Sequence, residues 1–124
     1  MNRFAMLAAG LVVAAAGSAL SSTASADATC GDRANPCPLQ KWMHDNMGAK
    51  LQDGKLDAVA ASFDAVATMS PDPAWTDWTK IAKDGAAAAR RGGDAGTRGA
   101  RAACKSRHDE YKTLYRTRFR TRPV

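Results

Sequence analysis

Apolar residues recur at helical spacing along most of this chain, and no stretch alternates apolar and polar residues as a half-buried strand would. The first predicted helix begins at Pro38, because a proline in the first turn loses no helical hydrogen bond. It ends at Asp53-Gly54, where glycine suits the left-handed position after a helix. The apolar stripe of this helix comprises Leu39, Trp42, Met43, Asn46, Met47 and Lys50 or Leu51.

The second and third predicted helices are separated by Ser70-Pro71-Asp72-Pro73, which interrupts the helical pattern. Asp72 is the predicted N-cap of the third helix and Pro73 its first-turn residue. The second helix presents Leu56, Val59, Phe63, Val66 and Met69 or Ser70 on one face. The third presents Trp75, Trp78, Ala82, Gly85 and Ala89. Small residues from Gly85 to Ala89 would let a neighbouring helix or a flat ring approach closely.

A fourth predicted helix follows Gly92-Gly93, with Asp94 available as its cap. Gly96 and Gly99 leave its start undetermined. From Arg101 onward the pattern is regular, and the side predicted to face inward carries Cys104, His108, Tyr111, Tyr115 and Phe119. Four helices with short connections predict an all-α fold, an antiparallel four-helix bundle over residues 38–122.

The segment before these helices has the pattern of a secretory signal peptide over residues 1–26. A basic start at Arg3 precedes an uncharged apolar run, and Ala24-Ser25-Ala26 fits the small-residue cleavage site. The run is shorter than the roughly 20 residues of a membrane span, so no stable membrane anchor is expected. We therefore expect a periplasmic or secreted protein that begins at Asp27, with an N-terminal loop segment over residues 27–37.

The net charge of the chain limits the classes of partner that we expect. The chain of 124 residues carries 18 basic and 12 acidic side chains, a net charge of +6. Export disfavours nucleic acid as the target of this charge and favours acidic proteins or anionic membrane surfaces. No nucleophile–base pair and no paired carboxylate site stands out, so an enzyme is not expected.

Three cysteines would meet an oxidising compartment after export. Cys30 and Cys37 flank a loop-like stretch, and their pairing would leave Cys104 as a free thiol. A bridge between Cys37 and Cys104 and an intermolecular bridge are the alternatives. With two histidines, of which His44 is predicted to face solvent, the sequence shows no zinc-ligand spacing.

The run Cys104-Lys105-Ser106-Arg107-His108 matches the haem attachment motif C-x-x-C-H with arginine in place of the second cysteine. On a helix Cys104 and His108 lie one turn apart on the same face, as a covalently attached haem requires. The structural alternative is that Cys104 fills a core position and His108 is a partly buried polar residue. Arg107 would contact a haem propionate or be solvated.

With the signal peptide and the four helices, the run Cys104–Tyr111 resembles the class II cytochromes c, the cytochrome c′ family and its low-spin relatives. The resemblance covers roughly residues 38–122. It implies a haem c attached through a single thioether at Cys104, with His108 as the proximal iron ligand. In low-spin members a methionine of the first helix is the sixth ligand, a role that falls here on Met43, with Met47 as the second candidate.

The function implied by this resemblance is single-electron transfer by an exported haem protein. Its expected partner is a redox protein, and a second copy of the chain, in a homodimer, is the other expected partner. The alternative function is a haem-free exported binding or structural module derived from such a cytochrome.

Overall fold

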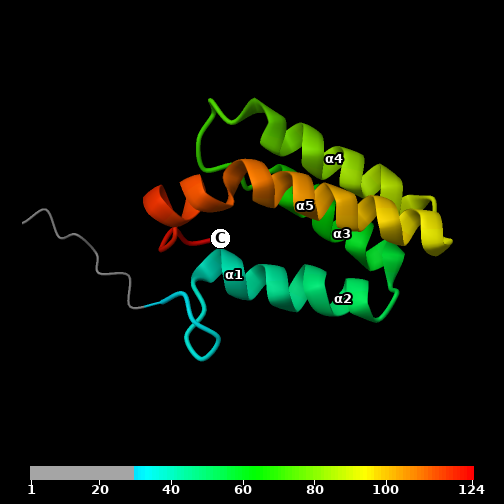
Figure 1. Ribbon diagram of the computed structural model, residues 1–124, viewed down its shortest axis with the longest axis horizontal. Coiled ribbons are helices and arrows are strands. Elements are labelled where there is room, and N and C mark those ends of the chain that lie inside the picture. Colours follow the sequence, from blue (N-terminus) through cyan, green and yellow to red (C-terminus); the bar gives the residue numbers. More distant parts are fainter. Residues whose placement is uncertain (1–29) are drawn as a thin grey trace, which may run out of the picture.

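The computed structural model of the chain describes residues 30–124, and the regular structure of this part is entirely helical. The first helical run is continuous from α1 (Pro38–Met43) through a π-helical turn, η1 (His44–Gly48), into α2 (Ala49–Gln52). It is followed by α3 (Leu56–Ala67), α4 (Thr76–Arg90) and the long α5 (Gly93–Arg118) (Figure 1). The all-α prediction is confirmed for the described residues. None of these helices is long and apolar enough to cross a membrane.

Helices α3, α4 and α5 pack against one another in chain order, and small residues make their close approach possible. A Cβ atom added at Gly85 of α4 would lie 2.6 Å from the ring of Phe63 on α3. A Cβ atom added at Gly99 of α5 would lie 2.6 Å from Cβ of Ala88 on α4. Both distances are shorter than a carbon–carbon contact allows. The predicted close approach at the small residues of the third helix is therefore confirmed.

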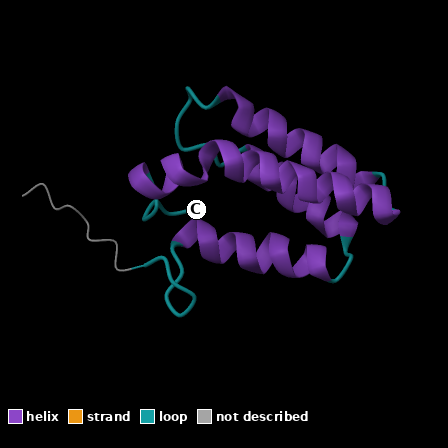
Figure 2. Cartoon of the chain, viewed as in Figure 1, coloured by secondary structure: helices purple, strands orange, loops and turns teal. Residues whose placement is uncertain are grey.

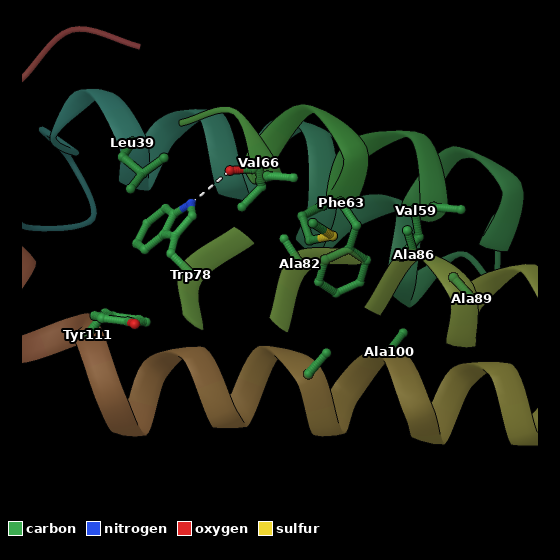
Figure 3. Packing of buried hydrophobic residues seen from close by; sticks show 14 of the residues in the cluster. Leu39, Val59, Phe63, Val66, Trp78, Ala82, Ala86, Ala89, Ala100 and Tyr111 are labelled. Atoms are coloured by element: carbon green, nitrogen blue, oxygen red, sulfur yellow. Dashed lines mark hydrogen bonds between the residues drawn. The ribbon is translucent and has the colours of Figure 1, made fainter. Parts of the chain in front are cut away.

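The core lies between α3, α4 and α5, with the α1–α2 run covering one side (Figure 3). The largest fully buried side chains are Trp78, Phe63, Val59 and Val66. The indole Nε1 of Trp78 donates a hydrogen bond of 2.8 Å to the carbonyl oxygen of Val66. These residues belong to the apolar faces predicted for the second and third helices, so those faces are confirmed.

The structure corrects one predicted helix start and determines another that the sequence had left open. Helix α4 begins at Thr76 rather than Pro73, because Asp72 supports a separate turn before the helix: its Oδ1 accepts from the Ala74 amide at 2.9 Å. Helix α5 begins at Gly93, so Gly96 and Gly99 lie inside it. Their missing side chains are compensated by the tight packing of this end of α5 on α4.

The loop before α1 is closed by a disulfide between Cys30 and Cys37, which confirms the local pairing and leaves Cys104 free. Residues 30–37 form neither helix nor strand (Figure 2). The guanidinium of Arg120 donates a hydrogen bond of 2.5 Å from Nη2 to the carbonyl oxygen of Cys30, so the loop is held to the C-terminal end of the chain. The predicted signal peptide, residues 1–26, lies outside the described residues.

Candidate functional site

A cavity of about 420 Å³ lies between α1, α4 and the C-terminal half of α5. Its inner wall is formed by Leu39 and Met43 from α1, Trp78 from α4, and Arg107, Tyr111 and Tyr115 from α5. The disulfide loop closes one side of it. Its size is at the lower end of the range of about 300–1,000 Å³ that is usual for small-molecule sites.

Arg107 lines this cavity and is only 5% exposed. Its burial follows from the register of α5, because Ala103, Arg107, Tyr111 and Tyr115 recur every four residues along the inward face. Arg107 therefore points into the protein, and the solvated position considered for it is wrong. Of the residues predicted to face inward, Tyr111 and Tyr115 are buried, and Cys104 and Phe119 pack against the core. His108 is exposed instead, and its neighbour Arg107 is buried.

The guanidinium of Arg107 has weak partners. Its Nη2 donates to the thioether sulfur of Met43 at 3.4 Å, and its Cζ lies 5.4 Å from the ring centre of Trp78. Its Nη1 is buried and has no hydrogen-bond partner among the described residues. No carboxylate of residues 30–124 forms an ion pair with it. The cavity therefore contains a buried cation with an unused donor.

Burial lowers the pKa of Arg107 below its ordinary value, because desolvation disfavours the charged form. Arginine nevertheless stays protonated at neutral pH, since its usual pKa lies above about 12. An unsatisfied buried donor costs roughly 1–3 kcal/mol, and more when the group is charged. An anion in the cavity would remove this cost, so the electrostatics favour a negatively charged ligand.

The rim of the cavity adds further positive charge. His108, Lys112, Arg116 and Arg120 all line it, and no acidic residue does. Partial desolvation lowers the pKa of His108, and the charges of Arg107 and Lys112 lower it further. An entering anion therefore meets positive charge at the rim before it reaches Arg107.

The aromatic wall is tightly packed and offers mainly apolar surface. Trp75 stacks on Tyr111 with ring centres 4.8 Å apart, and Trp78 stacks on Tyr115 with centres 6.1 Å apart. Burial raises the pKa of Tyr111 to about 12, so its hydroxyl stays protonated. The only N–H of the Trp78 indole is already bonded to the backbone of α3. The wall can therefore hold an apolar or aromatic ligand body.

The residues predicted for a haem site are only partly brought together. Met43 lines the cavity, with its sulfur next to the guanidinium of Arg107. His108 is exposed at the rim. Cys104 is partly buried against the core, where burial raises its thiol pKa, and is not part of the cavity lining. Met47, the second methionine candidate, is 4% exposed within the core.

Cys104 therefore lies outside the cavity that Met43 and His108 line. A haem iron between His108 and Met43 would place its positive charge close to Arg107, which already donates to the proposed ligand sulfur. For other metals, no three His, Cys, Asp or Glu side chains cluster as ligands within residues 30–124. His44 is exposed, as predicted, and pairs with Asp45.

The sequence named Arg107 only as a contact of a haem propionate or a solvated residue, and it did not assign Trp78 to a site. The signal for Arg107 was present, because Arg107, Tyr111 and Tyr115 form a regular series at a spacing of four residues. The series was passed over because a charged side chain is seldom expected at a core position.

Comparisons with known proteins gave no match to this chain, whether among protein-family models, curated proteins or solved structures. The functional proposal therefore depends on the geometry of the chain itself.

Proposed function

We propose that this protein is a haem-free, exported helical module that binds a small anionic molecule in the cavity between α1, α4 and α5. The observation that carries the proposal is the buried guanidinium of Arg107, which lines the cavity with an Nη1 donor that no described residue satisfies. Natural proteins rarely bury a cation without a partner. A bound anion would be that partner.

The proposed architecture is an antiparallel four-helix bundle, in which the α1–α2 run counts as one helix. Helices α3, α4 and α5 pack in chain order, and the connections between them are short. The hydroxyl of Ser62 on α3 donates a hydrogen bond of 2.5 Å to the carbonyl oxygen of Asn46. This bond joins the first helical run to α3. This arrangement supports the cavity, because α1 stands apart from α5 at the end where the cavity lies.

Export would account for the disulfide of such a module. In an oxidising compartment the Cys30–Cys37 bond persists and keeps the loop at the edge of the cavity. An exposed cation of α5 away from the cavity, such as Arg98, would remain available for an acidic protein partner.

The test is a calorimetric titration of the mature protein, beginning at Asp27, with paired ligands that differ only in charge. Each pair comprises a small organic anion and its neutral amide. The proposal predicts that anions bind and that their neutral partners bind at least tenfold more weakly. Equal binding of charged and neutral members, or no binding by any anion, would refute it.

A single-electron-transfer haem protein is the second candidate. The observation in its favour is the free thiol of Cys104, one helical turn before His108, as covalent attachment would need. Expression with cytochrome c maturation proteins, followed by a haem stain of the denatured product, separates the two candidates. A stained product that turns colourless in Cys104→Ala would establish the haem protein, whereas a colourless product beside a loaded control cytochrome supports the haem-free module.

A further inference from the structure

We propose that the ligand is a small aromatic monocarboxylate, which enters with its carboxylate against Arg107 and its ring against Trp78 and Tyr111. This inference rests on the proposed anion-binding function and specifies the chemical class of the anion. It follows from three features of the cavity: one buried cation, aromatic walls, and the thioether of Met43 as the acceptor that now faces the cation.

The number of buried charges selects a monoanion. Arg107 is the only buried cation in the lining, because the other four basic residues lie at the rim and are exposed or half-buried. One buried guanidinium compensates one negative charge. A phosphate monoester would bring close to two charges into the interior, and the uncompensated part would carry a large desolvation cost.

The planar shape of the guanidinium selects a carboxylate. A guanidinium can donate two parallel hydrogen bonds to the two oxygens of a carboxylate. Nη1 is unused, and Nη2 is occupied only by the Met43 sulfur at 3.4 Å. A thioether is a weak acceptor on a flexible side chain, so a carboxylate oxygen can displace it. Both nitrogens then become available to the ligand.

The walls of the cavity select an aromatic body. Trp78 is 2% exposed and Tyr111 is 5% exposed, and their ring centres lie 5.7 Å apart (Figure 3). Leu39 adds an aliphatic surface on the α1 side. An aromatic wall favours offset-stacked or tilted contacts with a ligand ring. The cavity volume of about 420 Å³ suits a ligand of one or two rings.

The experiment is calorimetric titration of the mature protein with four ligands: benzoate, benzamide, cyclohexanecarboxylate and phenyl phosphate. Benzoate should bind most tightly. Benzamide should bind about 10- to 150-fold more weakly, which is the fold-change expected from losing hydrogen bonds to a charged group. Cyclohexanecarboxylate, which keeps the charge and loses the aromatic face, should bind several-fold more weakly.

The variant Arg107→Met removes the cation and keeps an unbranched side chain, so benzoate binding should fall by the same 10- to 150-fold. Arg101→Met is the matched control, since Arg101 is an exposed arginine of the same helix outside the cavity lining. It should leave benzoate affinity within about twofold, because a distant exposed charge is largely screened. If Arg107→Met fails to fold, Arg107→Lys supplies the comparison, since lysine keeps the charge and loses the two-pronged geometry.

The outcomes separate the two levels of the proposal. If phenyl phosphate binds more tightly than benzoate, or cyclohexanecarboxylate binds equally well, the aromatic monocarboxylate is refuted and anion binding stands. If benzamide equals benzoate, or none of the four binds, the anion-binding function itself is refuted. Benzoate binding that is unchanged in Arg107→Met would place the ligand elsewhere and refute both.

Discussion

Replacing Arg107 by methionine should make the ligand-free protein more stable while it weakens ligand binding. The reason is that the guanidinium is 5% exposed, lacks a carboxylate partner and leaves Nη1 unsatisfied. A methionine side chain of similar reach can fill the same space beside Trp78 without a buried charge. In the native protein, Arg107 would thus lower the free energy of unfolding. Such a loss of stability is common where ligand binding needs a group that folding does not need.

The magnitude follows from opposing contributions. Relief of an unsatisfied charged donor contributes roughly 1–3 kcal/mol to the free energy of unfolding. Loss of the contact between Arg107 Cζ and the Trp78 ring, 5.4 Å apart, removes about 0.5–2 kcal/mol. The net expectation is an increase of about 1 kcal/mol, which for a domain of this size raises Tm by about 4–8 °C.

The assay is urea and thermal unfolding followed by far-UV circular dichroism at neutral pH, without ligand. Arg101→Met serves again as the control, and as an exposed substitution it should change the free energy of unfolding by less than about 0.5 kcal/mol. A loss of more than 1 kcal/mol in Arg107→Met, with the control unchanged, would show that the guanidinium stabilises the fold. The buried, unpaired cation would then be the wrong description of the site.

Three further predictions concern packing, the disulfide loop and pH. Gly85→Ala should lower the free energy of unfolding by about 1–3 kcal/mol, measured in urea, because its Cβ would lie 2.6 Å from the buried ring of Phe63; an unchanged midpoint would contradict the packing. Removing the Cys30–Cys37 disulfide by a double alanine substitution should lower the free energy of unfolding by about 2 kcal/mol. It should also weaken benzoate binding, because the loop lines the cavity; an unchanged benzoate affinity would show that the loop does not contribute to the site. Folded His108 has a lowered pKa, so stability should fall as pH drops below about 6.5 and level off below the folded pKa; His108→Gln should remove this dependence, and an unaltered pH profile would count against it.

Much of the helical architecture could be predicted from local pattern. The face of α3 through Val59, Phe63 and Val66 follows directly from helical periodicity, and all three residues are fully buried. Gly54, with a φ of 69°, has the left-handed conformation predicted after the first helical run. The disulfide between Cys30 and Cys37 was favoured because a short loop separates the two cysteines.

The candidate site was harder to predict, because it depends on the rotation of α5 against its neighbours. The haem-like motif placed Cys104 and His108 on the inward face. Cys104 packs against the core, but His108 is exposed and its neighbour Arg107 is buried. A difference of one residue turns a helix by about 100°. The spacing of Arg107, Tyr111 and Tyr115 indicated an inward position for Arg107. Whether a charged side chain occupies such a position is decided by contacts with residues far away in the chain.

The start of the third helix was mispredicted for a related reason. Asp72 and Pro73 have the sequence of a helix N-terminus, yet Asp72 caps a turn and α4 begins at Thr76. A helix N-cap and a turn both use a hydrogen bond from a nearby backbone amide to the aspartate side chain, so the same sequence is compatible with either. The position of Trp75 in the core, at 7% exposure, decides between them through tertiary packing.

The most direct test of the account is a crystal structure of the protein grown with benzoate. The account predicts a benzoate in the cavity between α1, α4 and α5, with its carboxylate accepting hydrogen bonds from Arg107 and its ring against Trp78. A carboxylate bound only at the exposed rim, or an Arg107 turned into solvent with the cavity collapsed, would contradict it.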